Sequence, residues 1–311
     1  MPSIVVSAFK QKVYNRYADT IRDGRLTGLV AKFSVAIPAS VVSDTPHLRE
    51  KTAKIGLVGR AAAIFRVDEI IVYADNPTAN QTREMDLIGL LLSYMETPQY
   101  LRKRLFKLRP ELECAGILPP LRTPHHPLNR NAKGLKVGEY REGVTVAKEK
   151  ANTLVDIGVE RPAVLANMQL SLGRRVTVKV KSVAEMVEVE LAERGDVSEY
   201  WGYVVTVEKQ PFGRLVKSRG FDLTIATSKL GVPFADVAED MKEKWRRAEA
   251  VLVAFGAPSQ GLHEIVRKEG LDLDDVVDFV VNTIPSQATE TVRTEEALFV
   301  TLAILNERFR V

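Results

Sequence analysis

The feature that most limits the folds open to this 311-residue chain is a change of pattern in its middle. Between residues 140 and 207, short segments alternate apolar and polar residues and are broken by glycines, which is typical of the strands of a small barrel. On either side, apolar strand patterns alternate with amphipathic helix patterns. Neither flanking part is long enough to make a well-covered parallel sheet alone. We therefore expect one α/β domain, residues 1–115 and 211–311, with an all-β barrel, residues 116–210, inserted into it.

The spacing of apolar residues predicts where the individual elements lie. In the first part, we expect strands at residues 3–8, 30–37 and 67–73, a polar excursion at 14–27, and helices at 47–65, 84–96 and 100–108. Ser43-Asp44-Thr45-Pro46 predicts the start of the first of these helices, with an N-cap ahead of a proline in the first turn. Residues 116–136 lack periodicity and indicate a linker. Barrel strands are expected at residues 140–146, 152–157, 161–165, 174–180, 186–191 and 202–207.

Composition excludes several classes of protein. Hydrophobic residues make up 45% of the chain and charged residues 27%, which is ordinary for a soluble globular protein. No apolar run approaches the roughly 20 residues that a membrane span needs, and the first residues lack the pattern of a signal peptide. A single cysteine, Cys114, excludes a disulfide framework and any cysteine-rich metal site. We expect a cytoplasmic protein that does not enter a membrane.

Two residue patterns that resemble ligand sites do not fit on closer inspection. Gly56 and Gly59, with Asp75 downstream, lie inside an amphipathic helix, whereas a dinucleotide fingerprint needs its glycines directly after a strand. No phosphate-binding lysine loop of the nucleoside triphosphatases is present. His125 and His126 lack further metal ligands at suitable spacing, so a structural or RNA-facing loop is favoured and no metal site is expected.

The net charge of +4 is modest, but the placement of the basic residues is uneven. They gather in one stripe around the predicted linker: Arg102, Lys103, Arg104, Lys107, Arg109, Arg122, Arg130, Lys133 and Lys136. Such a stripe suits contact with phosphates, whose strength comes from the release of counterions. From charge alone, a solvated helix face beside a polar loop is an equally good interpretation.

Three loops in the last third of the chain follow apolar strands. They lie within residues 222–231, 251–264 and 279–297, and they are rich in glycine, proline, hydroxyl and amide residues. In an open α/β sheet, ligands bind beyond the carboxyl ends of the strands. The three loops together therefore predict a pocket of backbone amides and carbonyls suited to a folded adenosine cofactor.

Several segments resemble the SPOUT methyltransferases, above all their archaeal and eukaryotic branch of RNA uridine N3-methyltransferases. They are Ile37-Pro38-Ala39-Ser40, Phe255-Gly256 with Gly261-Leu262, Asn282-Thr283 and the stretch from Thr291 to Ala297, together with Pro124-His125-His126, Tyr140 to Val144, Tyr200-Trp201-Gly202-Tyr203 and Asp222 to Ser228. The resemblance covers essentially the whole chain in order. It implies a parallel sheet with a deep trefoil knot, an OB-like insertion, a homodimer, S-adenosylmethionine as cofactor and RNA, ribosomal RNA in particular, as partner.

The resemblance also implies which residues hold the cofactor. By position, these are Ala226, Thr227 and Ser228 on one wall, Phe255, Gly256 and Gly261 on the second, and Asn282, Thr283, Ile284, Thr291 and Val292 on the third. The relatives often have Gly-Gly and Pro-Gly-Gln-Gly where this chain has Gly256-Ala257-Pro258 and Pro285-Ser286-Gln287-Ala288. These added Cβ atoms leave open a second hypothesis, a catalytically silent RNA-binding or ribosome-assembly factor that retains the fold.

For methylation of uridine N3 in ribosomal RNA, three residues are candidates for the chemistry. Arg60 and Arg293 would stabilise the negative charge that develops on the base when its imide proton leaves, and Glu296 would accept a proton or a ligand hydroxyl. A surface ion pair is the other interpretation of Arg60. Methylation of a different base atom also remains open, because the fold of a pocket does not fix the acceptor.

The barrel is the predicted site of RNA binding. OB-like barrels bind single strands through a basic groove and aromatic platforms. The barrel residues predicted to contact RNA are Tyr140, Arg141, Arg174, Arg175 and Lys179.

Overall fold

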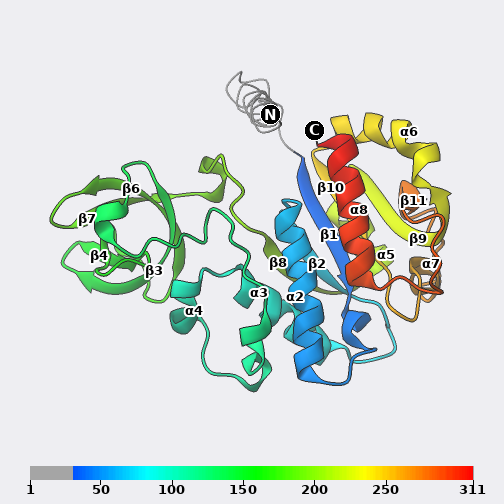
Figure 1. Ribbon diagram of the computed structural model, residues 1–311, viewed down its shortest axis with the longest axis horizontal. Helices are drawn as coiled ribbons and strands as arrows, with labels where there is room; N and C mark the ends of the chain where they lie inside the picture. The colour runs from blue at the N-terminus through cyan, green and yellow to red at the C-terminus, as the bar shows by residue number, and fades with distance from the viewer. Residues whose placement is uncertain (1–30, 311) are drawn as a thin grey trace, which may run out of the picture.

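A computed structural model describes residues 31–310 as a six-stranded parallel sheet covered by helices, beside a closed five-stranded barrel (Figure 1). The expected division into an α/β part and a small barrel is therefore confirmed. The strand predicted at residues 3–8 and the excursion at 14–27 lie outside the described residues. The domain boundaries at residues 115 and 210 stay a prediction.

The sheet has the strand order β11-β9-β10-β1-β2-β8, and every neighbouring pair is parallel. Its strands are β1 (Lys32–Pro38), β2 (Glu69–Ala74), β8 (Val204–Pro211), β9 (Leu223–Pro233), β10 (Ala250–Ala254) and β11 (Phe279–Asn282). Because all strands run the same way, their carboxyl ends meet at one edge of the sheet.

Helices cover both faces of this sheet, as alternate side chains of its central strands require. In β10, Val251 and Val253 join one apolar cluster, and Leu252 and Ala254 join the other. The first cluster takes side chains from α2 (Leu48–Ile64), α3 (Thr82–Glu96), α6 (Phe234–Arg247) and α8 (Thr294–Phe309), and the second from α5 (Phe212–Arg219) and α7 (Leu262–Arg267). Such two-sided burial is typical of parallel sheets.

The remaining short elements connect the sheet to the barrel or turn the chain. They are α4 (Gln99–Leu105) and the 3-10 turns η1 (Ala39–Val42), η2 (Pro110–Leu112), η3 (Ala115–Ile117), η4 (Ala132–Gly134) and η5 (Arg194–Asp196). The predicted linker indeed holds no α-helix or strand.

The barrel closes in the order β3-β4-β5-β7-β6 around its own apolar core of residues such as Val155, Val178 and Val189. Its strands are β3 (Tyr140–Glu149), β4 (Asn152–Asp156), β5 (Ala163–Leu165), β6 (Arg175–Val183) and β7 (Val187–Ala192). Five of the six predicted barrel strands are thereby confirmed.

The prediction of a sixth barrel strand at residues 202–207 is wrong, because this segment does not belong to the barrel. This segment forms β8, which pairs in parallel with β2 at the edge of the large sheet. An edge strand is half exposed, so its apolar and polar residues alternate much as they do in a barrel strand. The pattern alone could not separate the two.

The start of α2 also differs from the prediction in its detail. The helix begins at Leu48 with His47 at the N-cap, and Pro46 precedes the helix instead of lying in its first turn. The Asp44 carboxylate binds the Lys54 ammonium at 2.8 Å instead of capping the helix. The glycines rejected as a dinucleotide motif do lie inside α2. A Cβ on Gly59 would stand 2.7 Å from the Tyr203 hydroxyl, so this glycine serves close helix packing.

Over residues 31–310, the helices are all too short or too polar to cross a lipid bilayer.

Candidate active site

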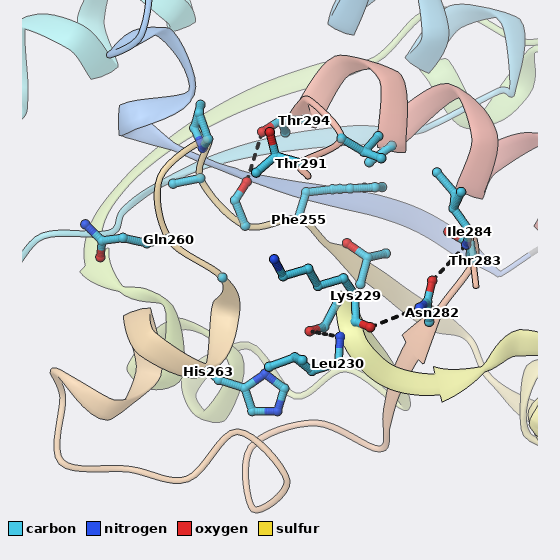
Figure 2. Close-up of a pocket in the computed structure, with 18 of the residues that line it drawn as sticks. Lys229, Leu230, Phe255, Gln260, His263, Asn282, Thr283, Ile284, Thr291 and Thr294 are labelled. Atoms are coloured by element: carbon cyan, nitrogen blue, oxygen red, sulfur yellow. Dashed lines mark hydrogen bonds between the residues drawn. The ribbon is translucent and has the colours of Figure 1, made fainter. Parts of the chain in front are cut away.

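A pocket of about 280 Å³ opens at the carboxyl ends of β9, β10 and β11, with the starts of α7 and α8 at its rim (Figure 2). We call it the strand-end pocket. Of the eleven residues predicted to hold a cofactor, ten line it: Thr227, Ser228, Phe255, Gly256, Gly261, Asn282, Thr283, Ile284, Thr291 and Val292. Ala226 does not, because it lies fully buried in the apolar cluster under the sheet.

Side-chain hydrogen bonds tie the three walls of the strand-end pocket together. Thr227 Oγ1 donates to the Ala254 carbonyl at 2.9 Å, which joins β9 to β10. Asn282 Nδ2 donates to the Lys229 carbonyl at 3.0 Å, which joins β11 to β9 (Figure 2). The walls are thus held in place by neutral groups within the protein, a preorganisation that suits the binding of a ligand.

The third link runs from the start of α8 to the turn after β10. Thr294 Oγ1 donates to the Gly256 carbonyl at 3.0 Å. A Cβ on Gly256 would stand 3.0 Å from the Gln260 carbonyl oxygen, so the tight turn there favours glycine. Ala257 belongs to the same turn and donates its backbone N–H to Gln260 O at 2.9 Å. The departure from a Gly-Gly pair therefore leaves the tightest position as glycine.

A buried tyrosine fixes the base of the second wall. Tyr73 donates its hydroxyl to the Phe255 carbonyl at 2.8 Å. Burial, with the nearby Asp75 carboxylate, raises the pKa of Tyr73 well above its ordinary value, so the hydroxyl stays protonated. Asp75 in turn accepts hydrogen bonds from the backbone N–H and the hydroxyl of Ser40.

The lining of the strand-end pocket is mixed in character. Leu230, Phe255 and Ile284 offer apolar surface, while the backbone and the hydroxyl and amide side chains offer donors and acceptors. The charged side chains on the lining are Lys229 and Glu264, and the Lys229 side chain extends into the cavity in Figure 2. The arrangement can hold a ligand with an apolar ring and an anionic end.

Sequence reasoning missed several lining residues, among them Lys229, Leu230, Glu264 and Thr294. Lys229 and Leu230 belong to the predicted loop 222–231, but β9 runs past the sheet edge to Pro233 and carries them along the wall. Their position directly after Ser228 was a sufficient signal. His263, at the start of α7, also lines the pocket (Figure 2).

The three residues proposed for the chemistry are not brought together. Arg293 is the N-cap of α8, and its backbone N–H donates to the Glu296 carboxylate at 3.0 Å. Both are exposed, and they do not line the pocket, although Val292 and Thr294 on either side of Arg293 do. Glu296 thus already serves to cap the helix.

Arg60 lies away from the strand-end pocket. From α2, its guanidinium Nη1 donates to the carbonyls of Pro120 at 2.9 Å and Leu121 at 2.6 Å. Among the described residues Arg60 holds the linker and forms no ion pair, and its proposed part in the chemistry stays a prediction.

Two of the residues predicted to contact RNA are bound to carboxylates within the protein. Arg141 is only 1% exposed and binds Glu139 at 2.7 Å, so the expectation that it faces RNA is corrected. Arg175 binds Glu96 and Glu142, each at 2.6 Å, at the contact between barrel and sheet. Its guanidinium is therefore engaged with carboxylates instead of being free for phosphate.

Glu96, at the end of α3, is the centre of this contact. Its buried carboxylate also binds Arg194 at 2.7 Å. We call Glu96, Glu142, Arg175 and Arg194 the junction ion network. Burial alone would raise the pKa of Glu96, but the Arg175 and Arg194 guanidiniums outweigh it and lower that pKa.

The histidine pair belongs to the same contact. His125 and His126 each place Nε2 within hydrogen-bond distance of the Glu96 carbonyl, at 3.0 and 2.7 Å. Because a carbonyl only accepts, each Nε2 carries the proton. Burial lowers the pKa of both rings, that of His126 to about 4. Both rings thus attach the linker to the end of α3, and within residues 31–310 no group of three or more metal-ligating side chains gathers around them or elsewhere.

The other barrel residues predicted to contact RNA remain accessible. Arg174 is exposed, and the Lys179 ammonium stands 5.5 Å from the centre of the Tyr140 ring. These three keep the basic and aromatic character that RNA contact requires.

Known proteins resemble this chain over most of its length. Residues 32–305 match the family described as "putative RNA methyltransferase". A 28S rRNA (uridine-N(3))-methyltransferase of Drosophila melanogaster is 32% identical over 312 residues, which cover 89% of this chain and 62% of that protein. The protein of the same name from Mus musculus is 34% identical, with 88% and 75% covered. An uncharacterized protein of Halobacterium salinarum is 34% identical, with 88% and 98% covered. Since the family spans nearly all the residues that form the sheet, the pocket and the barrel, the chain belongs to this family of RNA methyltransferases.

Proposed function

We propose that this protein transfers a methyl group from S-adenosylmethionine to N3 of a uridine in ribosomal RNA. The observation that carries the proposal is the strand-end pocket, which lies at the carboxyl ends of three adjacent strands in a chain that belongs to an RNA methyltransferase family. The names of the fly and mouse relatives supply the base atom and the class of RNA.

The lining of the pocket fits S-adenosylmethionine. A volume of about 280 Å³ lies near the lower end of ligand pockets, about 300 Å³. Leu230, Phe255 and Ile284 provide apolar surface for an adenine ring. Gly261 leaves open space at the wall, since an added Cβ would meet nothing within 4 Å.

The charges of the lining agree with the two ends of this cofactor. The Lys229 ammonium matches the carboxylate of its amino-acid part, and the carbonyl oxygens at the ends of the strands match its sulfonium. When bound, S-adenosylmethionine supplies an electrophilic methyl group. The chain must hold the base in line with that group and keep water out.

Methylation at N3 requires the loss of the imide proton, which spreads negative charge onto O2 and O4 of the base. We propose that the Arg293 guanidinium, beside the positive end of α8, stabilises this charge. The Glu296 oxygen that does not cap the helix is the proposed acceptor for a proton or a ligand hydroxyl. Since N3 is paired within a duplex, the target uridine must be single-stranded or extruded.

We also propose the architecture and assembly implied by the SPOUT resemblance. In it, the barrel is OB-like, the loop of residues 283–293 takes part in a trefoil knot with α8, and two copies of the chain form a dimer. Three exposed apolar side chains on the adjacent helices α2 and α8, namely Leu57, Ile64 and Val300, support the dimer (Figure 1). Sedimentation equilibrium tests it. We also propose that the protein acts in the cell interior, in the cytoplasm in particular.

Two measurements test the proposed function. Calorimetry with S-adenosylmethionine should show saturable binding, whereas a silent RNA-binding factor would show none. Mass spectrometry of nuclease-digested ribosomal RNA, incubated with protein and cofactor, should detect N3-methyluridine. Methylation of another base atom would give a methylated nucleoside with a different chromatographic retention time.

The role of Arg293 is tested by Arg293→Ala, which should lower the rate of methyl transfer by about a hundredfold or more while the protein stays folded. Arg308→Ala is the matched control, because Arg308 is exposed at the other end of the same helix. An Arg293→Ala rate equal to that of the control would remove Arg293 from the mechanism.

A further inference from the structure

A second cavity, of about 210 Å³, lies where the sheet domain meets the barrel. We call it the junction cavity. It is lined by Gln99 and Tyr100 of α4 and by Arg122, His126, Leu128 and Arg130 of the linker. Figure 1 shows α4 beside the barrel, and α4 packs against the barrel strand β3. The residues of this cavity take no part in the strand-end pocket.

Two guanidiniums on the wall of the junction cavity lack carboxylate partners. Some arginines elsewhere in the described chain form ion pairs, for example Arg104 with Asp156 and Arg219 with Glu69. Within residues 31–310, Arg122 and Arg130 form no ion pair and no side-chain hydrogen bond, and both are exposed. Each therefore keeps its planar set of donors free for an anion.

The backbone of Arg122 is held in an unfavourable conformation. Its φ is +52°, in the left-handed region that residues with a side chain seldom adopt. The two carbonyls just before it, those of Pro120 and Leu121, accept hydrogen bonds from Arg60. Such strain persists only where the surroundings enforce it, and it gathers at ligand sites. The linker is thus fixed so that Arg122 lines the cavity.

The other polar groups of the junction cavity are also fixed. Tyr100 donates its hydroxyl to the Glu142 carbonyl at 2.8 Å, which attaches the cavity wall to the barrel. His126 donates Nε2–H to the Glu96 carbonyl and stays neutral, because burial lowers the pKa of its ring to about 4. Nδ1 of His126 is then an acceptor, the kind of group that a ribose 2′-hydroxyl can reach.

We propose that the junction cavity binds the sugar–phosphate backbone of the RNA substrate, with Arg122 and Arg130 on a phosphate and His126 on the adjoining ribose. The inference rests on the proposed function, since it names where the RNA is held. Two exposed basic side chains nearby, Lys103 on α4 and Lys107 after it, extend the positive surface beyond the cavity. The barrel face around Tyr140 and Lys179 would then be a second contact on the same strand.

The test compares two double variants of the full chain. Arg122→Gln with Arg130→Gln removes the proposed phosphate-binding guanidiniums. Arg83→Gln with Arg161→Gln removes the same charge from exposed arginines outside the cavity. Binding of a fluorescein-labelled oligouridylate is measured by anisotropy over a series of salt concentrations, and S-adenosylmethionine binding is measured by calorimetry on each protein.

We expect the cavity variant to bind the oligouridylate about tenfold more weakly and the control variant to stay within about twofold of the wild type. The slope of log K against log salt should shrink by about 0.7 for each phosphate that the variant no longer neutralises. S-adenosylmethionine affinity should be the same in all three proteins. His126→Phe should reduce the preference of the wild type for the oligouridylate over the matching oligodeoxyuridylate.

Equal losses of affinity in the two double variants, or none in either, would overturn the junction cavity as the RNA site. So would saturable binding of inorganic phosphate that the cavity variant loses while its RNA affinity stays unchanged, which would identify a small-anion site. The proposed function fails separately: a wild-type protein that binds RNA but no S-adenosylmethionine contradicts the enzyme and leaves the cavity result intact. A wild type that binds no RNA contradicts both.

Discussion

The strand-end pocket and the junction ion network are both polar, but they are built in opposite ways. The pocket is open, and its walls are joined by neutral bonds such as that from Thr227 to the Ala254 carbonyl. The network is closed, and two carboxylates and two guanidiniums compensate one another in it. Glu96 at its centre is 4% exposed.

This difference predicts how each region responds to change. A neutral hydrogen bond contributes about 1 kcal/mol to stability, whereas a buried charge that loses its partner costs several times more. The pocket can therefore be altered with its main effect on ligand binding. The junction should respond mainly in stability, because Glu96 of α3 compensates the charges of Arg175 and Arg194 from the barrel region.

The largest effect is expected from Glu96→Gln. The substitution leaves Arg175 and Arg194 without the carboxylate that both share, so the free energy of unfolding should fall by about 3–5 kcal/mol. Urea denaturation measures it. Glu188→Gln, on the exposed face of β7, should change stability by less than about 0.5 kcal/mol. Similar values for both variants would mean that the network contributes no more than a surface charge.

The stability of the junction should also depend on pH, through His126. The folded-state pKa of His126 is about 4, below the ordinary 6.5, so protonation favours the unfolded chain. The stabilisation by neutral His126 is complete above pH 6.5 and is lost as the pH falls to 4, by about 3 kcal/mol. Urea denaturation across this range should give a falling curve, which His126→Asn flattens. Parallel curves for the two proteins would contradict this account of the junction.

In the strand-end pocket, Gly261→Leu should reduce cofactor binding strongly and stability only slightly, the opposite of the effect expected at the junction. An added Cβ meets no atom within 4 Å, so the side chain is accommodated, and the N-cap change costs about 1 kcal/mol or less. The side chain would occupy the cavity, so calorimetry should show S-adenosylmethionine affinity reduced more than tenfold, about 1.4 kcal/mol. Gly116→Leu, where a Cβ is equally free, is the control and should bind normally. An unchanged affinity in Gly261→Leu would place the cofactor elsewhere.

The strand-end pocket was predictable because its signals are local. Each wall follows an apolar strand within a few residues, and parallel strands bring such loops to one edge of a sheet. Ala226 was the exception. Side chains alternate between the two faces of β9, and that of Ala226 points into the apolar cluster. The sequence pattern does not show at which residue of this segment the side chains begin to line the pocket.

The junction was not predictable, because its partners are far apart in the chain. Arg175 meets Glu96 across 79 residues, and nothing near Arg175 indicates that a carboxylate will come to it. Charged residues on strands are mostly exposed, so Arg141 and Arg175 were expected to face RNA. The prediction that β8 belongs to the barrel was wrong for a related reason. An edge strand of a sheet and a strand of a barrel show the same alternation of apolar and polar residues.

Arg60 allows the smallest and most specific test of the contrast between the two regions. Arg60→Gln removes the donor to the Pro120 and Leu121 carbonyls, which relaxes the linker before Arg122. RNA affinity should fall about threefold, because the variant alters the position of Arg122 and keeps its charge. Methyl transfer at saturating RNA should match the wild type, as should S-adenosylmethionine affinity. If the saturated rate falls while RNA binding is unchanged, Arg60 acts in the chemistry after all, through a contact that one chain does not contain. A positioning role moves the RNA concentration needed for half the maximal rate, whereas a catalytic role moves the maximal rate itself.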